Sequence, residues 1–342
     1  MALEITKLQN GEQIASRQMM IYTASISKTK SGKDYLMATV GNKTGKIEAR
    51  MWTLPPNFSL PRVGTVYSIT AIVTEFNGQK QLNIASMSKI PDSEINLIEY
   101  TIEVPSRVAT STFEKVIGYI REELIANDSQ LLLRVFDNIL NKYKRMMPEH
   151  TAACNVHHAG VGGWLKHTNE VVKYADAIYH NLPEHTSDLI RHDLLLLGAF
   201  LHDIGKLTAY GFESGVSVMT DTGRLLEHTC SGLLIVHTAA MEEFIPMEPS
   251  AERGKDDIQM LEHIIAAHHG ELEYGAAVNP VTLEAHIVST ADKLSADLDA
   301  IYTAISEMPR EEAWTQKIFT QHNRQFTIPV LTRPEVDEDG AE

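Results

Sequence analysis

The chain has few of the features that mark secreted, membrane or fibrous proteins. It has only two cysteines among 342 residues, Cys154 and Cys230, and they form no C-x-x-C pair and predict no disulfide framework. Its longest apolar runs, such as LLLLGAFL, are far shorter than the ~18 residues that span a bilayer. The first ten residues lack a basic start followed by an apolar stretch. We therefore expect a cytoplasmic protein that makes no membrane contact.

Positive charge is also scarce, since the net charge is −15, which argues against a protein that coats itself uniformly with nucleic acid. The distribution is uneven. Residues 1–95 hold eight Lys and three Arg against seven Asp plus Glu, a balance of +4, so the remaining chain carries −19. This indicates either a mildly basic N-terminal module on an acidic body or an ordinary fluctuation of charge between domains.

Five short segments between Met19 and Ile90 have the β-branched, alternating pattern of strands. Glycines at 32, 41, 45, 64 and 78 mark the turns, and Asn77-Gly78 is a hairpin signal. Five strands in about 75 residues predict a small β-barrel of the OB-fold type, a fold that binds single-stranded oligonucleotides. We assign this nucleic-acid-binding domain to residues 1–95.

Aromatic and basic side chains of this barrel are candidates for contact with a nucleic-acid strand. Aromatic rings can stack on bases, whereas Lys and Arg can follow a phosphate backbone. Strand aromatics more often fill cores, and loop lysines are often only solvated. The candidate contact residues are Lys33, Tyr35, Lys46, Arg50, Trp52, Phe76 and Lys80, with Tyr67 as a further ring.

Beyond a proline-bounded connector at residues 91–105, the apolar period becomes helical, with Ser111 or Thr112 as the expected N-cap. A second helix is predicted at about 130–145, and nearly every segment from there to about 305 reads as helix. We divide this part into a connector with helices at 96–150, an all-α domain at 151–325 and an acidic, disordered tail at 326–342.

Histidine is abundant by contrast, with fifteen residues, and its most informative occurrence is the pair His202-Asp203 at the end of the helix LLLLGAFLHDIGKL. A histidine nitrogen beside a carboxylate suits Mn²⁺, Fe²⁺, Zn²⁺ or Co²⁺, and Lys206 one turn on can neutralise a phosphate. Further histidines and an aspartate recur in helical settings at intervals of about one helix and a return loop. A helical bundle can direct all of them to one internal point. They are His167, His228, His268, His269 and Asp292.

The order H…HD…H…HH…D, in the settings GGWLKHT, LHDIGKL, EHT, AAHHGELEYG and TADKLSADLD, resembles the HD-domain metal-dependent phosphohydrolases. With the barrel in front, the chain is similar to the YhaM-type 3′→5′ exoribonucleases over most of residues 15–325. The resemblance implies a divalent-metal site, commonly supported by Mn²⁺, with Fe, Co, Mg or Zn as alternatives, and single-stranded RNA or DNA as substrate. Carried over, it makes His167, His202, Asp203 and Asp292 metal ligands, and it completes a second metal position with His228 and one or both of His268 and His269.

Phosphodiester hydrolysis assigns further roles. Asp203, with two oxygens, is the expected bridge between two metal ions, and Lys206 would offset charge on the phosphoryl oxygens, unless it is a surface lysine. His158, beside His157, would contact the substrate or protonate the leaving 3′ oxygen, or it is a loop residue. Six other histidines lie outside the pattern, and we expect them to be surface or packing residues: His180, His185, His192, His237, His263 and His286.

The leading hypothesis is therefore a metal-dependent 3′→5′ exonuclease that hydrolyses single-stranded RNA to nucleoside 5′-monophosphates. An alternative is an HD phosphohydrolase that acts on a mononucleotide or a cyclic (di)nucleotide, although a small substrate does not require the barrel. A binding module with a structural metal is disfavoured, because structural zinc sites are rich in cysteine. The sequence leaves the oligomeric state open; a homo-oligomer would offer a narrow opening between subunits that excludes duplexes.

Overall fold

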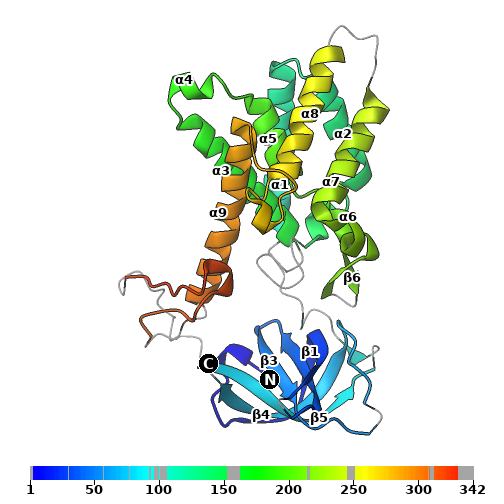
Figure 1. The fold of residues 1–342 in the computed structure, drawn as a ribbon, viewed down its shortest axis with the longest axis vertical. Coiled ribbons are helices and arrows are strands. Elements are labelled where there is room, and N and C mark those ends of the chain that lie inside the picture. Colours follow the sequence, from blue (N-terminus) through cyan, green and yellow to red (C-terminus); the bar gives the residue numbers. More distant parts are fainter. Residues whose placement is uncertain are drawn as a thin grey trace.

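A computed structural model describes residues 3–29, 31–56, 58–76, 78–91, 94, 95, 100, 106–151, 162–213, 216–244, 251–306, 308 and 312–329. The barrel and the helical body are two separate parts of the molecule, as Figure 1 shows. Cys154, His157, His158, Asn77 and the end of the expected tail, residues 330–342, lie outside the described residues.

The N-terminal part is a closed barrel of five strands in the order β1-β2-β3-β5-β4. The strands are β1 (Gln13–Lys28), β2 (Asp34–Asn42), β3 (Gly45–Met51), β4 (Val66–Phe76) and β5 (Gln79–Lys89). All neighbouring pairs are antiparallel except β3 and β5, which run parallel with Ala49 opposite Leu82. The predicted barrel is confirmed, and its strand order is consistent with the OB-fold.

Side chains along the strands point alternately into the barrel and out of it, and those that point inward fill its interior. In β2, for example, Leu36, Ala38 and Val40 point inward and are buried, whereas the residues between them are less covered. Gly78 has a left-handed backbone with φ of 76° and joins β4 to β5, where Phe76 pairs with Gln79. The left-handed backbone of Gly78 is what the Asn77-Gly78 hairpin signal predicts for its second residue.

The second part is helical, as the sequence predicts. Its α-helices are α1 (Ser106–Ala126), α2 (Gln130–Tyr143), α3 (Gly163–His180), α4 (Glu184–Ser187), α5 (His192–Leu201), α6 (Lys206–Ala209), α7 (Asp221–Glu243), α8 (Ala251–Ala267) and α9 (Leu283–Ser306). Short 3₁₀ helices lie at Ile5–Lys7, Met147–Glu149, Leu272–Tyr274 and Phe319–Gln321. No helix among the described residues is both long and apolar enough to cross a membrane.

Helix α5 lies at the centre of this body and positions the site. Residues 193–201 are all buried, because α1, α3, α8 and α9 pack around the helix. This explains why LLLLGAFL is apolar on every side instead of showing a helical period. The helix ends at Leu201, so that His202 and Asp203 emerge from its C-terminus inside the bundle.

Two expectations for this part are wrong. Helix α1 begins at Ser106, more than a turn before the expected N-cap at Ser111 or Thr112, because no proline or glycine interrupts residues 106–112. A hairpin of β6 (Tyr210–Glu213) and β7 (Val216–Met219) lies between α6 and α7, in a part where nearly every segment was expected to be helical. The alternating sequence YGFESGVSVM, with a glycine at its centre, favours a hairpin there.

Candidate metal centre

The seven residues expected to bind metal come from five segments of the helical body and meet at one buried point. His167 is on α3, His228 on α7 and Asp292 on α9, while the two pairs follow the C-terminal ends of α5 and α8. Five of them are almost fully buried, with exposed fractions of 1–6%: His167, His202, Asp203, His228 and His268. The sequence spacing therefore brings ligand-type side chains together as a bundle can.

The Asp203 carboxylate lies between two groups of imidazoles. Its Oδ2 is 3.3 Å from Nε2 of His167 and 3.3 Å from Nε2 of His202. Its Oδ1 is 3.5 Å from Nε2 of His228 and 3.6 Å from Nε2 of His268. Each oxygen thus faces a different pair of histidines.

We call the two groups the first and second clusters. The first cluster is His167, His202 and Asp203, and the second is His228, His268 and His269; within each, one ligand atom per residue lies within 4.8 Å of the others. Asp292 joins the first cluster, because its Oδ1 is 3.0 Å from Nε2 of His167. Both residues of the His268-His269 pair face the site.

Hydrogen bonds on the far side of the imidazoles fix their orientation. Nδ1 of His202 donates to the carbonyl of Ala199, and Nδ1 of His268 donates to the carbonyl of Ile265, both at 2.7 Å. Because a carbonyl can only accept, these rings carry a proton on Nδ1, and Nε2, the atom that faces Asp203, is the nitrogen available to a metal ion. This is the arrangement of metal-binding histidines.

His167 is held by a relay that the sequence analysis missed. Its Nδ1 is 3.0 Å from Oγ of Ser295, which donates to Oε2 of Glu170 at 2.8 Å. Glu170 follows His167 by three residues on α3, and Ser295 follows Asp292 by three on α9, so helical spacing could have revealed both. The relay explains why a serine is fully buried beside the site.

His228 is held by its own neighbour, Glu227. Nδ1 of His228 donates to Oε2 of Glu227 at 2.5 Å, although that carboxylate is 59% exposed. Glu227 interrupts α7 with φ of 60° and ψ of 164°, a region that non-glycine residues occupy at a cost of about 1–3 kcal/mol. This backbone conformation places the Glu227 carboxylate beside Nδ1 of the His228 ring.

Neighbouring charges in the centre shift one another's pKa values. Burial alone would raise the pKa of Asp203, but Lys206 and His202 outweigh it and hold that pKa well below its usual range. Burial lowers the pKa of His167, yet hydrogen bonds to Asp203 and Asp292 raise it to about 9. Without metal, a proton on Nε2 of His167 therefore lies between the carboxylates of Asp203 and Asp292. A metal cation would take the place of this proton.

The residues of the centre fit a divalent metal ion. Within the described part of the chain, Asp203 Oδ1 and His268 Nε2 are buried without a hydrogen-bond partner. In each cluster the Nε2 atoms of two histidines also lie close together. The distance is 3.2 Å between His202 and His167 and 3.1 Å between His228 and His269. Buried polar atoms that converge without partners indicate that an ion belongs among them.

Lys206 extends into the same centre, since its Nζ lies 2.6 Å from Asp203 Oδ2 and its side chain is only 15% exposed. It is therefore not a surface lysine. The indole of Trp164 donates to the backbone carbonyl of Asp203 at 3.0 Å, which holds the chain at the end of α5. The expected catalytic role of His158 concerns a residue outside the described part.

Three of the expected nucleic-acid contacts gather on the outside of the barrel around Arg50. The rings of Tyr35 and Trp52 stack with centroids 4.6 Å apart, and the Arg50 guanidinium lies 5.7 Å from the Trp52 ring and 5.6 Å from that of Phe76. Trp52 is 37% exposed and Phe76 55%. We call these four residues the aromatic patch.

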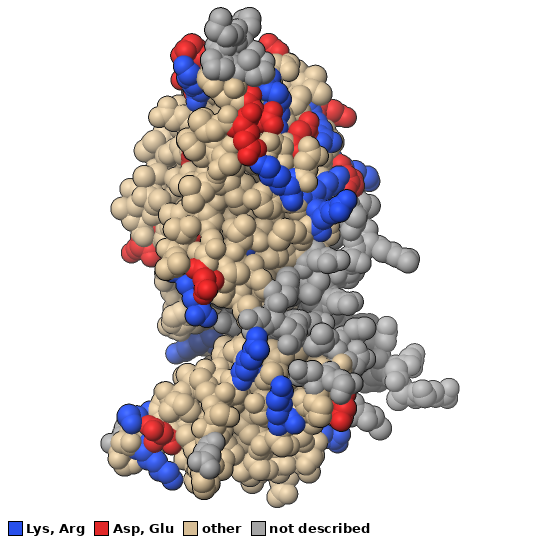
Figure 2. All heavy atoms as spheres, turned by 90° about the vertical axis from the view of Figure 1, so that its right-hand side faces the viewer, with Lys and Arg blue, Asp and Glu red and all other residues tan. Residues whose placement is uncertain are grey.

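The other barrel candidates have different surroundings. Lys33 and Lys80 are exposed, and Lys80 pairs with the residue before Phe76 across the β4–β5 ladder. Lys46 lies over the ring of Tyr22, with Nζ 4.4 Å from its centroid, and Tyr67 packs against the barrel core. On the face in Figure 2 the barrel shows more Lys and Arg than Asp and Glu, in agreement with its positive balance.

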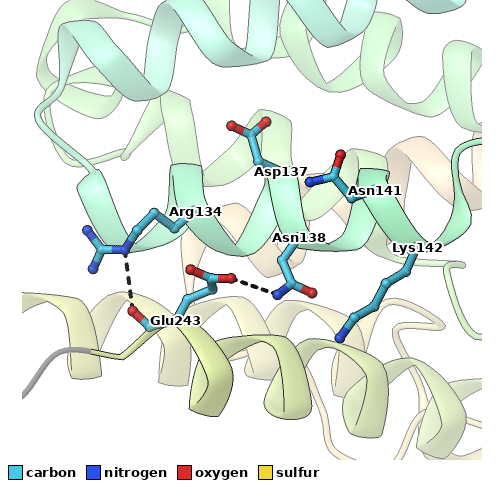
Figure 3. A pocket seen from close by; sticks show the side chains of 6 residues that line it. All are labelled: Arg134, Asp137, Asn138, Asn141, Lys142 and Glu243. Carbon is cyan, nitrogen blue, oxygen red and sulfur yellow. Dashed lines mark hydrogen bonds between the residues drawn. The ribbon is translucent and has the colours of Figure 1, made fainter.

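A polar pocket lies elsewhere, between α2 and the end of α7 (Figure 3). Its side chains are engaged with one another: Arg134 donates to the Glu243 carbonyl, and Asn138 donates to the Glu243 carboxylate. None of its lining residues is among the expected site residues. The pocket therefore adds no residue to the Asp203 centre.

Comparison with known proteins finds related sequences for this chain. Residues 164–297 match the family model of the HD domain, a span that contains all seven residues of the centre. The chain is also 25% identical over 341 residues to the 3'-5' exoribonuclease YhaM of Geobacillus sp. (strain WCH70), and the match covers 99% of both chains. The resemblance seen in the sequence is confirmed, and the chain is a hydrolase whose HD domain occupies residues 164–297.

Proposed function

We propose that this hydrolase is a metal-dependent exonuclease that shortens single-stranded RNA from its 3′ end and releases nucleoside 5′-monophosphates. The observation that carries the proposal is the position of the Asp203 carboxylate, with one oxygen toward each histidine cluster. The full-length similarity to an exoribonuclease supports RNA as the substrate. The work is divided between residues 1–95, which hold the strand, and residues 151–325, which hydrolyse its end.

Two divalent ions, with Mn²⁺ as the preferred metal, would be held by the two clusters and Asp292, and Asp203 would serve both. When bound, they supply Lewis acidity at the phosphate and activate water for attack on phosphorus. The Nδ1 hydrogen bonds keep the imidazoles oriented before metal arrives, so that little reorganisation accompanies binding.

Lys206 contributes charge at the reacting phosphate. Burial lowers its pKa, but the nearby carboxylates of Asp203 and Asp292 outweigh burial and raise it, so the ammonium stays protonated. With Asp203 engaged by a bound metal ion, that ammonium would be available to the phosphoryl oxygens, where charge develops in the transition state. His158 would protonate the leaving 3′ oxygen.

The aromatic patch would hold the strand ahead of the hydrolysed end. Tyr35, Trp52 and Phe76 offer ring faces to bases, and Arg50 between the rings offers charge to a phosphate. Lys33, Lys46 and Lys80 add positive charge on the same barrel. Stacking of this kind tolerates any base, as an exonuclease that degrades mixed sequences requires.

The test is incubation of 5′-labelled single-stranded RNA with Mn²⁺ and either the wild type, Asp203→Ala or Asp188→Ala. The last is a matched control, because Asp188 is an exposed aspartate outside the centre. We expect ladders that shorten from the 3′ end with the wild type and the control and none with Asp203→Ala. A labelled DNA of the same sequence measures the preference for the 2′-hydroxyl.

Two results would contradict the proposal. Intact RNA with the wild type under several metals, together with hydrolysis of a mononucleotide or cyclic dinucleotide, would establish the small-substrate phosphohydrolase instead. Shortening by Asp203→Ala at the wild-type rate would place the reaction at another site or in a contaminant.

A further inference from the structure

A third cluster of metal-ligand side chains lies apart from Asp203, where the chain passes from α3 to α5. Asp176 and His180 are one turn apart at the end of α3, and His192 is the first residue of α5. One donor atom from each lies within 4.8 Å of the other two. Helix α4, which belongs to the same connection, lies at the end of the helical body away from the barrel (Figure 1).

The distances suit a small tetrahedral ion after a slight adjustment of the side chains. Asp176 Oδ1 is 2.8 Å from Nε2 of His192 and 3.3 Å from Nδ1 of His180. Bonds of about 2.0–2.2 Å to a tetrahedral zinc ion place its donors roughly 3.4 Å apart. The His180 side chain is 56% exposed and can adjust, exchanging its 3.0 Å contact with the backbone oxygen of Asp176 for an ion.

His192 is positioned by two further neighbours. Its Nδ1 lies 3.2 Å from Oε2 of Glu123 on α1, and the Tyr179 ring stacks on it at 4.1 Å and 9°. If Nδ1 donates to Glu123, Nε2 presents its lone pair to Asp176. A carboxylate behind the imidazole is the support that metal-binding histidines have.

Asp176 is supported in the same way. The hydroxyl of Tyr119 on α1 donates to its Oδ1 at 3.1 Å. Side chains of α1 therefore brace both Asp176 and the partly buried His192, while the third donor, His180, stays open to solvent. An ion can enter from that side, and a water can complete its coordination.

We propose that Asp176, His180 and His192 bind a divalent transition-metal ion of the zinc class. The ion joins the C-terminal end of α3 to the N-terminal end of α5. From His180 back to His167 is about 20 Å along α3, and from His192 to His202 about 15 Å along α5, at 1.5 Å per residue. The ion therefore clamps the two helices that carry the first cluster without touching the reacting centre.

The test uses the full-length protein and Zn²⁺ alone. Wild type, His180→Gln and His185→Gln are dialysed against the same buffered free Zn²⁺, and bound zinc is measured by mass spectrometry. His185 is the matched control, because it is an exposed histidine on the same connection. We expect His180→Gln to bind one zinc ion fewer than the wild type and His185→Gln to bind the same number.

Thermal unfolding gives a second measurement. Zn²⁺ should raise the midpoint of wild type and His185→Gln more than that of His180→Gln, because only the first two retain the clamp. Equal stoichiometry in wild type and His180→Gln would overturn the proposal and make the cluster a hydrogen-bond network in which His192 joins Glu123 to Asp176. Equal losses in both variants would also overturn it, since they indicate unspecific binding by surface histidines.

Discussion

A methyl group added at Gly205 tests how closely the metal centre depends on the packing of α6 against α7. The backbone of Gly205 is helical, with φ of −65° and ψ of −21°, so alanine meets no conformational strain there. Its Cβ, however, would lie 1.9 Å from the carbonyl oxygen of His228 and 2.4 Å from the backbone nitrogen of Gly232. Ordinary contact begins near 3.4 Å.

The clash can be relieved only by moving backbone, because both opposing atoms are main-chain atoms. A displacement of roughly 1.5 Å is needed to restore van der Waals contact. It would separate His228 from Asp203, whose nearest atoms are 3.5 Å apart. Since a misplacement of about 1 Å can cost about 100-fold in rate, we expect Gly205→Ala to lose at least that much activity.

The assay is the initial rate of Mn²⁺-supported release of nucleoside 5′-monophosphates from single-stranded RNA, with Mn²⁺ affinity measured by calorimetry. Gly198→Ala is the control, because the atoms nearest its Cβ would be side-chain atoms of Ile264, with Cδ1 at 2.8 Å and Cγ2 at 2.9 Å, and not backbone atoms. Both variants should lose about 1–3 kcal/mol of stability through overpacking. Wild-type rate and Mn²⁺ affinity in Gly205→Ala would refute the reasoning, as would an equal loss of rate in Gly198→Ala.

The remaining predictions concern positioning, stability and strand binding. Glu227→Ala removes the hydrogen-bond acceptor behind His228, and we expect a 10–100-fold loss of Mn²⁺ affinity in titrations, with partial recovery in Glu227→Gln. Asp193→Asn should lower the free energy of unfolding by about 1–3 kcal/mol in urea unfolding at pH 7, because the partly buried Arg191 loses its ion pair with Asp193 and keeps the one with Asp257. Burial raises the pKa of Asp193, but Arg191 outweighs it and lowers that pKa below its ordinary 3.8, so the contribution is present above pH 4. It is lost as the pH falls through the lower folded value, and the difference between wild type and variant should shrink there. Trp52→Ala should weaken RNA binding by about 1–3 kcal/mol in fluorescence titrations and leave hydrolysis of bis-p-nitrophenyl phosphate unchanged.

Local patterns predicted the fold well where secondary structure is set by neighbours in sequence. The five strands and the turn at Gly78 follow from alternation and turn chemistry, and the helices from their apolar period. The hairpin at residues 210–219 was missed, because a short alternating segment between helices is easily read as their continuation. The start of α1 was placed late, because capping residues occur inside helices as well as at their ends.

The centre could be predicted because its histidines and aspartates recur at intervals that a bundle can fold onto one point. The sequence could not predict which ligand atoms lie on the same side of the centre. The two oxygens of Asp203 divide the histidines into two clusters, and this depends on the way α5 ends, a tertiary feature. Helical spacing places Glu170 and Ser295 one turn from expected ligands, but their hydrogen bond to each other and the meeting of Asp176 with His192 depend on how the helices pack.

Anomalous diffraction from crystals of the full-length protein soaked in Mn²⁺ tests the central claim most directly. Two peaks are predicted, one within bonding distance of each oxygen of Asp203 and each also bonded to histidines of one cluster. Neither should persist at full occupancy in Asp203→Ala. A single peak that Asp203 does not contact, or full occupancy of both positions in the variant, would contradict the account.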